Sequence, residues 1–331
     1  MTHVPGQFVH RADPSDIIPT GWTRRAENRF SVSARWPAGH PFFSPVAGGH
    51  RHDPLLVAET VRQATMLVVH AELGVPVEDH FVMWDLHYTV DPDALAVDGL
   101  PHEVTADVTI TALGKGRGAN LRTDVVLTRG GRPLGIGGGT LHRSSALAYR
   151  RIRGAQLAVL GRPVPLIRGV APGLVGRRRP CDVVLGPGPG PGPDPGQWRL
   201  RIDTGHSTLF RRPNDHVPGM VLLEAARQAA VITVGGGEPF VPTGMAIAFQ
   251  RYAELDVPCW IEAESAPRAQ VGTGTGMGTG AGTASAEGPR AMTSVRISGR
   301  QNGEYVFLCT LTGPAAGTRA AGAVLADRVA S

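Results

Sequence analysis

Two stretches of the chain are apolar on almost every side of a helix, and they predict two buried helices. The first covers residues 53–72, where Asp53 serves as N-cap, Pro54 takes the first helical position and Gly74 ends the helix. The second covers residues 218–234. A helix without a polar face does not lie on a surface, so we expect other elements to wrap both.

Segments with the alternating pattern of half-buried strands surround each predicted helix. In the first half they are 29–36, 81–90, 103–113, 121–128 and 133–142, the last two forming a hairpin across residues 129–131. In the second half they are 198–203, 243–252, 257–264, 292–298 and 305–312. The glycines within 135–139 favour close strand packing over a phosphate loop, because no helix pattern follows them.

The two halves also share sequence motifs. Glu-x-x-Arg-Gln-Ala begins at Glu59 and again at Glu224, an offset of 165 residues, and Gly-His at 39–40 recurs at 205–206. An offset near half the chain length indicates two copies of one domain. A long central helix wrapped by an antiparallel sheet is the hotdog fold, so the pattern predicts an α+β tandem (double) hotdog.

Composition shifts divide the chain into four predicted parts. Residues 1–176 form an N-terminal arm and the first hotdog domain, and 177–197 form an Arg/Pro/Gly linker that includes the Pro/Gly tract at 185–197. Residues 198–316 form the second hotdog domain, with a Gly/Thr/Ala loop at 272–288, and 317–331 form a C-terminal tail.

Length, charge and cysteine usage narrow the function classes. The 331 residues suit two domains, and the net charge is +5. No window is apolar for the length of a membrane span, and no secretion signal is visible, so we expect a cytoplasmic protein without membrane contact. Cys181, Cys259 and Cys309 lack metal-ligand spacing, so we expect no metal and no cofactor. The arginines are mostly scattered, which argues against nucleic acid as a partner.

Charged residues inside the apolar helices are the first candidates for chemistry. Glu224 and Arg227, like Glu59 and Arg62, are three residues apart and share one helix face. One interpretation is a structural ion pair. The other is a carboxylate whose pKa is raised by burial and lowered by the guanidinium, and which is thereby poised as a general base.

The helix-entry sequences resemble a known family. The run from Asn214 through His216, Pro218 and Gly219 to Gln228 resembles the A-factor biosynthesis hotdog family, the bacterial gamma-butyrolactone signal synthases. The resemblance includes 9–11, 34–37, 40–42, 53–56, 62–63 and 81–86, and so spans most of the chain. Residues 218–224 are more distantly similar to the Pro-Gly-Val-Leu…Glu segment of beta-hydroxyacyl-carrier-protein dehydratases, although the expected Gly-His-Phe-Pro is absent.

The resemblance implies a reaction and partners. A beta-ketoacyl group passes from an acyl-carrier-protein thioester to a hydroxyl of dihydroxyacetone phosphate, and the ester then closes to a phosphorylated butenolide. Glu224 is the expected base, with Glu59 as its equivalent, and His216 is an expected acid or orienting group. The expected substrate-binding residues are Arg227 and Arg62 for phosphate, Gln228 and Gln63 beside them, the amides of Gly219 and Met220 for the thioester oxygen, and Trp84, with Met83 and Met245, along the acyl chain.

Other interpretations remain open at this stage. The same scaffold suits a thioesterase or dehydratase acting on acyl thioesters, or a non-catalytic acyl-carrier-binding protein. The cluster at 177–179 is a candidate docking site for the acidic carrier protein. His40 and His206 repeat, and each is either functional or hydrogen-bonded to a backbone carbonyl. The acyl chain, the number of working sites and the choice between a monomer and a homodimer are left open.

Overall fold

The computed structural model describes residues 4–37, 39–43, 46, 49–97, 102–114, 120–189, 196–210, 213–235, 240–266 and 292–314. The predicted loop at 272–288 and the predicted tail at 317–331 lie outside these residues. Within the described part, no helix has the length and apolar character needed to cross a membrane.

In the described chain, 12 strands form one antiparallel sheet in the order β1-β2-β4-β5-β6-β3-β9-β12-β11-β10-β8-β7. The first-half strands are β1 (Pro19–Ala26), β2 (Arg29–Arg35), β3 (His80–Val90), β4 (Glu103–Leu113), β5 (Asn120–Arg129) and β6 (Arg132–Ser144). The second-half strands are β7 (Leu185–Gly186), β8 (Gln197–Leu200), β9 (Gly244–Phe249), β10 (Trp260–Ala266), β11 (Met292–Gln301) and β12 (Glu304–Pro314).

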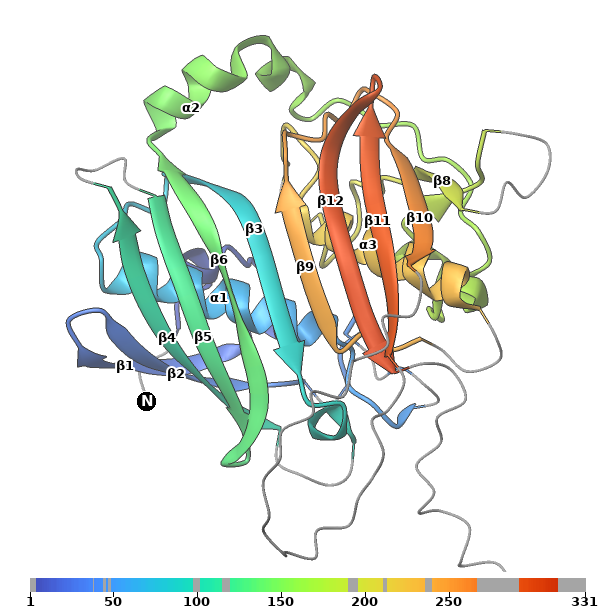
Figure 1. Cartoon of the computed structure of the whole chain (residues 1–331). Helices are drawn as coiled ribbons and strands as arrows, with labels where there is room; N and C mark the ends of the chain where they lie inside the picture. The colour runs from blue at the N-terminus through green and yellow to red at the C-terminus, as the bar shows by residue number, and fades with distance from the viewer. Residues whose placement is uncertain are drawn as a thin grey trace, which may run out of the picture.

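Two long helices lie against one face of this sheet, one in each half (Figure 1). They are α1 (Leu55–Ala71) and α3 (Gly219–Val234), and the shorter α2 (Ala146–Arg153) lies at the top edge, after β6. The 3-10 turns are η1 (Gly6–Val9), η2 (Pro14–Asp16), η4 (Asp93–Leu95), η5 (Gly154–Val159), η6 (Pro172–Val175) and η7 (Pro180–Asp182). The helices therefore form an inner layer, and the other sheet face looks outward.

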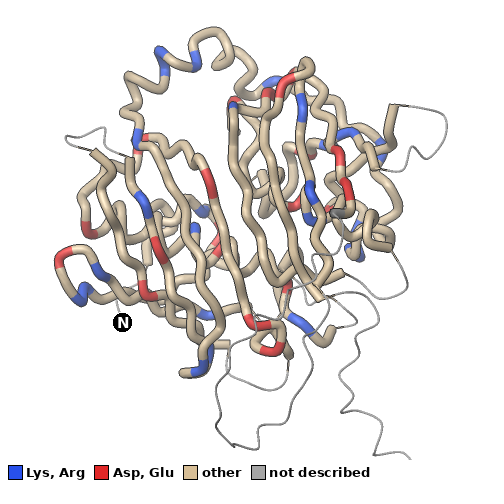
Figure 2. The backbone as a smooth tube through the Cα atoms, in the orientation of Figure 1, with Lys and Arg blue, Asp and Glu red and all other residues tan. Residues whose placement is uncertain are grey.

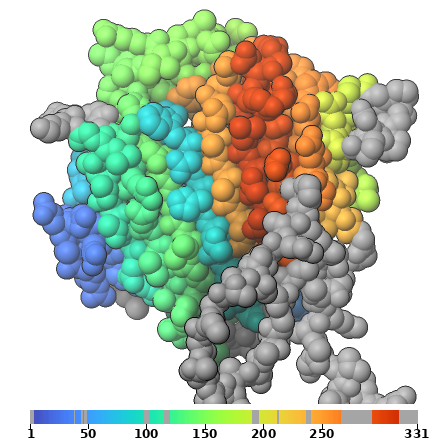
Figure 3. Space-filling view, in the orientation of Figure 1, coloured from blue at the N-terminus to red at the C-terminus, as the bar shows by residue number. Residues whose placement is uncertain are grey.

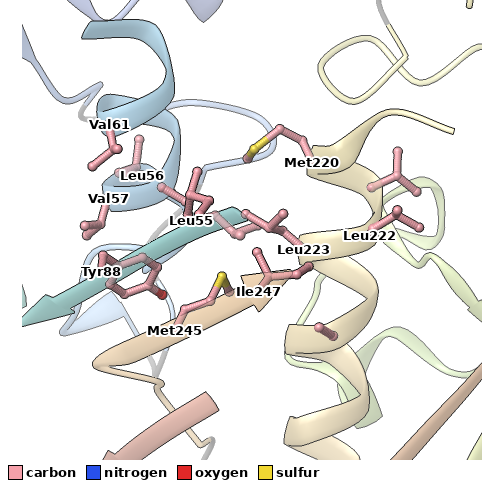
Figure 4. Packing of buried hydrophobic residues seen from close by; sticks show 14 of the residues in the cluster. Leu55, Leu56, Val57, Val61, Tyr88, Met220, Leu222, Leu223, Met245 and Ile247 are labelled. Atoms are coloured by element: carbon pink, nitrogen blue, oxygen red, sulfur yellow. The ribbon is translucent and has the colours of Figure 1, made fainter. Parts of the chain in front are cut away.

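The halves join edge to edge where β3 pairs with β9, with Leu86 opposite Ile247. This pairing makes the outer face continuous from the first half to the second (Figure 3). Behind it, Leu55 at the start of α1 and Leu223 of α3 approach each other, and Tyr88 and Met245 lie beneath them (Figure 4). The two cores therefore merge, and burying each large apolar side chain at this seam contributes about 1.5–3 kcal/mol.

Most predicted elements are confirmed within a few residues. Both buried helices form, and the Asp53 carboxylate accepts the Leu55 amide at 2.9 Å, although Pro54 rather than Asp53 takes the N-cap position. The predicted hairpin forms across Gly130 and Gly131, which both have positive φ, as a two-residue turn requires. The hairpin strands are β5 and β6, and the other predicted strands appear as β2–β4 and β8–β12.

Two elements were not predicted, and one predicted region differs. The segment before Arg29 was expected to be an extended arm, but its residues 19–26 pair with β2 as β1. Helix α2 was also missed. The Pro/Gly tract begins as strand β7, which pairs with β8 at the sheet edge, and residues 190–195 of the tract are outside the described part.

The predicted close packing at the glycines of β6 is confirmed. A Cβ on Gly135 would lie 2.2 Å from the Thr89 carbonyl oxygen, and one on Gly138 would lie 2.2 Å from that of Thr123. No side chain fits there without a shift of the backbone, so these glycines serve strand packing.

Candidate functional site

The carboxylate of Glu59 is the centre of a buried network in the first half. Helix α1 places it next to Arg62, whose Nε and Nη2 donate to the two carboxylate oxygens at 2.9 and 2.8 Å. Arg11, from the arm that precedes β1, donates to Glu59 at 2.9 and 2.6 Å, and Gln63 donates at 2.5 Å. Burial raises the pKa of Glu59, but the two guanidiniums and Gln63 outweigh it and bring the pKa to about 2.

The carboxylate of Glu224 has the same environment in the second half. Arg227 donates to it at 2.8 and 2.7 Å, Arg177 at 2.7 and 2.8 Å, and Gln228 at 2.6 Å. Burial again raises the pKa of Glu224, and Arg177 and Arg227 bring it to about 2. We call these sets the Glu59 network (Glu59, Arg11, Arg62, Gln63) and the Glu224 network (Glu224, Arg177, Arg227, Gln228).

Each network also ties the two halves together. Arg11 donates through Nη1 to the Thr208 carbonyl at 2.6 Å, and Arg177 donates through Nη1 to the Phe42 carbonyl at 2.9 Å. Thr208 and Phe42 are 166 residues apart, so the same contact occurs twice with the halves exchanged. Each carboxylate therefore holds a guanidinium that contacts the opposite domain.

The glutamines fix the arms to the helices. Gln63 donates to the Asp16 carbonyl at 2.7 Å and accepts the Ile18 amide at 3.0 Å. Gln228 repeats both contacts with Asp182 and Val184. The predicted placement of the glutamines beside each Glu/Arg pair is thus confirmed, while their partners are backbone groups of this chain.

Sequence reasoning misplaced one member of these networks. Arg177 was assigned to a linker and to a carrier-docking cluster, but it is 5% exposed and bonded to Glu224. The docking prediction is therefore wrong for this residue. A signal was present: Val-x-Arg occurs at 9–11 and at 175–177, with the same offset of 166 as the Gly-His pair. Residues 180–182 and 185–186 also pack in the second half, as η7 and β7.

The predicted role of the glutamates as poised bases is not supported by this arrangement. Each carboxylate receives two charge-assisted contacts from each of two guanidiniums, and such contacts favour the ionised form. A carboxylate with a pKa of about 2 is a weak proton acceptor at neutral pH. The guanidiniums are in turn engaged by the carboxylates, and the Arg227 side chain is 3% exposed against 16% for Arg62.

The two networks differ at Asp53. Its Oδ2 accepts from Arg177 at 2.7 Å, so the Glu224 network contacts a second carboxylate. Among the described residues, the Glu59 network has no counterpart to this contact. Two guanidiniums therefore share one hydrogen-bonded carboxylate in the first half and two in the second, while Asp16 also lies near enough to raise the pKa of Arg62.

His40 and His206 are bonded to the backbone, but to amides rather than to the predicted carbonyls. Nδ1 of His40 accepts the amides of Phe42 and Phe43 at 3.0 Å, and its Nε2 lies 2.9 Å from Asp16. His206 accepts two amides in the same way and lies beside Asp182. These histidines shape the loops that carry Phe42 and Thr208 to the networks.

His216 belongs to a different polar cluster at the start of α3. Its Nδ1 lies 3.0 Å from Asp215, which also accepts from Tyr149 at 2.7 Å and Arg153 at 2.5 Å. Burial raises the pKa of Asp215, but hydrogen bonds from His216, Arg153 and Tyr149 hold it well below its usual range. Tyr149 and Arg153 come from α2, where basic residues recur along the helix (Figure 2). The His216 side chain is 27% exposed, whereas Asp215, Tyr149 and Arg153 are buried.

The other predicted contact residues divide into two groups. Gly219 is exposed in the first turn of α3, and Met220 is buried next to it, so their amides lie at a helix N-terminus as predicted. Trp84 does not line the interior, and that prediction is wrong. A register irregularity between Met83 and Asp85 turns Trp84 to the outer face, where it is 46% exposed and stacked on His142.

Groups of three or more metal-ligating side chains do not occur in the part of the chain that the structure describes. The cysteines at 181, 259 and 309 are unbridged.

Comparison with known proteins adds a family and a fold. The family model of the A-factor biosynthesis hotdog domain matches residues 1–142 and 161–281. A protein of Streptomyces virginiae is 41% identical over 96% of this chain and 98% of its own length. One of Streptomyces coelicolor is 45% identical over 94% and 92%. Both relatives are named 2-oxo-3-(phosphooxy)propyl 3-oxoalkanoate synthase.

The solved structures that resemble this chain share its architecture. A candidate thioesterase from Novosphingobium aromaticivorans has a TM-score of 0.50 and 15% identity over 92% of this chain and 100% of its own. At that identity the likeness concerns the fold alone. The family match and this fold confirm the predicted double hotdog and the resemblance stated from the motifs.

Proposed function

The chain belongs to the A-factor biosynthesis hotdog family, and on that premise we propose that it is a beta-ketoacyl transferase. The acyl group passes from an acyl-carrier-protein thioester to the free hydroxyl of dihydroxyacetone phosphate. The ester that results is a 2-oxo-3-(phosphooxy)propyl 3-oxoalkanoate, and its ring closure with loss of water gives a phosphorylated butenolide. We infer that this takes place in the cytoplasm, where unbridged cysteines are the norm.

One observation carries the proposal. Relatives at 41–45% identity over nearly their whole lengths are synthases whose names contain both halves of this ester. The 3-oxoalkanoate part corresponds to the beta-ketoacyl group, and the 2-oxo-3-(phosphooxy)propyl part corresponds to esterified dihydroxyacetone phosphate. Both elements match what the helix-entry motifs imply for this chain.

The proposed phosphate ligand is Arg62. The Glu59 network has one more guanidinium than carboxylate, and Arg62 has the most exposed side chain of its charged members. A guanidinium matches phosphate in geometry and charge. Arg227 is buried and paired with Glu224. Arg177, the other guanidinium of that network, is paired with both Glu224 and Asp53, so two carboxylates balance the two guanidiniums. We therefore assign the Glu224 network to holding the two halves together.

The proposed group for the thioester oxygen is the start of α3. The amides of Gly219 and Met220 lie in the first helical turn, where backbone N–H groups lack intrahelical acceptors. Asp215 orients Nδ1 of His216, so protonated His216 presents Nε2–H as a donor. In this proposal the glutamates anchor guanidiniums rather than accept protons.

The direct test is mass spectrometry of the product from a synthetic beta-ketoacyl thioester and dihydroxyacetone phosphate. We expect the mass of the phosphorylated ester or its dehydrated butenolide only when both substrates are present. Dihydroxyacetone, which lacks only the phosphate, is the matched control for phosphate recognition. Free acid formed equally with and without the phosphate alcohol would point to a thioesterase, and tight carrier binding without turnover would point to a binding protein.

A further inference from the structure

Two histidines beside the Glu59 network have no histidine counterpart in the second half. Applying the arm offset of 166 to His10 leads to Gly176, and applying the helix offset of 165 to His70 leads to Gly235. By contrast, every member of the Glu59 network has an equivalent of the same residue type in the Glu224 network. The pair is therefore an addition to the first half rather than part of what holds a hotdog together.

The hydrogen bonds of this pair determine where its protons lie. Nδ1 of His70 is 2.7 Å from the Val75 carbonyl oxygen, which only accepts, so Nδ1 carries a hydrogen. Nε2 of neutral His70 then has a lone pair, and Nε2 of His10, 3.0 Å away, must donate to it. Neutral His10 consequently has its own lone pair on Nδ1. Burial lowers the pKa of His70, which favours the neutral form that this chain of bonds requires.

The backbone at His10 is unusual for its residue type. Its φ is 54°, in the left-handed region, and the equivalent Gly176 has φ 65°. Glycine adopts that conformation without steric cost, whereas a residue with a Cβ does not. A histidine held there, with its ring beside His70 and Phe81, suggests a requirement for the imidazole itself.

His10 also lies between the two guanidiniums of the Glu59 network along the chain. The preceding Val9 carbonyl accepts from Arg62 at 3.1 Å, and the following Arg11 donates to Glu59. A phosphate ester bound at Arg62 would thus lie near the imidazole of His10.

We propose that His10 is the catalytic base that deprotonates the substrate hydroxyl, and that His70 is a positioning residue that fixes its tautomer. This inference rests on the proposed acyl transfer. The hydroxyl proton moves to Nδ1 of His10 as its oxygen bonds to the thioester carbonyl carbon. The C–S bond then breaks, the thiolate takes the proton back from His10, and the products are the ester and the free carrier thiol.

Other charged groups face this pair and shape its titration. On the arm and on α1, the charged groups are those of the Glu59 network: Arg11, Glu59 and Arg62. Before β3 they are Glu78 and Asp79, and on β6 the charged group is Arg143, which is bonded to Asp79. Because the anions Glu59 and Asp79 are bonded to arginines, their charges are largely balanced near neutral pH.

The test compares His10→Gly, which installs the residue found in the second half, with the wild-type enzyme in the mass-spectrometric assay. We expect kcat to fall by about 10²- to 10⁴-fold, the contribution typical of a positioned base. The acid limb of the kcat–pH profile is expected to disappear, and added imidazole to restore part of the rate. His87→Ala, at a 45% exposed side chain on the outer face, is the matched control and should leave kcat and the profile unchanged.

Two further variants separate catalysis from folding. His10→Asn retains a side chain tolerated in the left-handed region, and it should lose activity as His10→Gly does while its thermal unfolding stays near that of the wild type. His70→Gln, which retains a donor and an acceptor, should lower kcat less and shift the pH profile. A folded His10→Gly enzyme with kcat within about threefold of the wild type, and the wild-type profile, overturns the inference. Failure of the wild-type enzyme to form ester defeats the proposed function instead.

Discussion

The Glu59 and Glu224 networks are copies of one arrangement that have diverged in charge and burial. Both hold a glutamate between a helix arginine and an arm arginine, and both place the arm arginine on a carbonyl of the opposite half. The Glu224 network adds Asp53 and has guanidiniums exposed by only 2–3%. The Glu59 network lacks that carboxylate, exposes Arg62 by 16% and has the His10–His70 pair beside it.

On the strength of this difference, we propose that the two copies divide two tasks. A balanced, buried ion cluster is suited to fixing geometry, because removing one partner leaves an uncompensated charge. A cluster with an unbalanced cation near solvent is suited to binding an anion. The same motif therefore predicts a structural role in one half and a substrate-binding role in the other.

Acidification protonates the glutamates of both networks, and we expect it to have the largest effect on stability. The pKa of each glutamate is about 2 in the folded protein, below its ordinary value of 4.5, so its stabilising contribution is complete above pH 4.5. That contribution is lost as pH falls from about 5 towards 2, by an amount we expect to reach several kcal/mol for both groups together. Urea unfolding between pH 7 and pH 3 measures it. A flat profile over this range would contradict the lowered pKa values.

Removing one glutamate at a time separates the networks. Glu224→Ala leaves two buried guanidiniums with Asp53 as their remaining anion, and we expect it to cost about 3–5 kcal/mol of unfolding free energy. Glu59→Ala should cost less, because Arg62 is able to turn towards water. Urea unfolding at pH 7 compares the two. Equal losses would show that the difference in burial has no energetic consequence.

Asp53→Asn probes the contact found only in the second network. Asparagine still caps α1 through its side-chain oxygen, so the substitution mainly removes the charge facing Arg177. We expect a loss of about 1–3 kcal/mol, typical of a buried charged hydrogen bond. The control is Asp124→Asn, at a 50% exposed carboxylate, which should change stability little. Equal stability losses in Asp53→Asn and Asp124→Asn would show that the contact between Asp53 and Arg177 does not distinguish the two networks.

The helix arginines should separate by the kind of defect they produce. With Arg62→Gln we expect the KM for dihydroxyacetone phosphate to rise about tenfold, a loss near 1.4 kcal/mol. The fold should also be destabilised, because Glu59 is buried and loses one of its two cations. Arg227→Gln should destabilise the fold for the same reason, because Glu224 is buried and would lose one of its two cations, but it should leave this KM unchanged. Steady-state kinetics and thermal unfolding of both variants are the measurements. An unchanged KM in Arg62→Gln would refute the phosphate assignment.

The smallest effect concerns the backbone of the two arms. Gly176→Ala places a Cβ where φ is 65°, and it should lower stability by about 1 kcal/mol without an effect on catalysis. The new Cβ would meet Arg227 at an ordinary 3.6 Å, so strain rather than a clash is the expected cause. Thermal unfolding checks it. A large loss of activity would mean that the second arm also serves the reaction.

Much of the fold was predictable because its signals are local. The apolar helices at 53–72 and 218–234, the alternating strands and the Gly130–Gly131 hairpin each depend on neighbouring residues. The repeated Glu-x-x-Arg-Gln-Ala motif revealed the duplication. Strand β1 and helix α2 were missed because both are short and largely exposed, and their places depend on pairing with β2 and on contacts with Asp215.

The candidate site was predictable only in part. Glu59 and Glu224 were identified by their charge in an apolar helix, which is a property of the sequence. Arg11 and Arg177 reach these carboxylates from 48 and 47 positions away, and local spacing does not indicate such contacts. Trp84 was assigned to the interior by its type, and a strand irregularity turned it outward.

The sequence by itself determined that this chain is a duplicated hotdog with a glutamate and an arginine on each central helix, because repeats and periodicity are properties of the order of residues. The tertiary structure alone decided that each acid meets two arginines and that one network gains Asp53. Burial and long-range contacts set the charge balance and the pKa of a side chain, and both arise only when distant segments pack together.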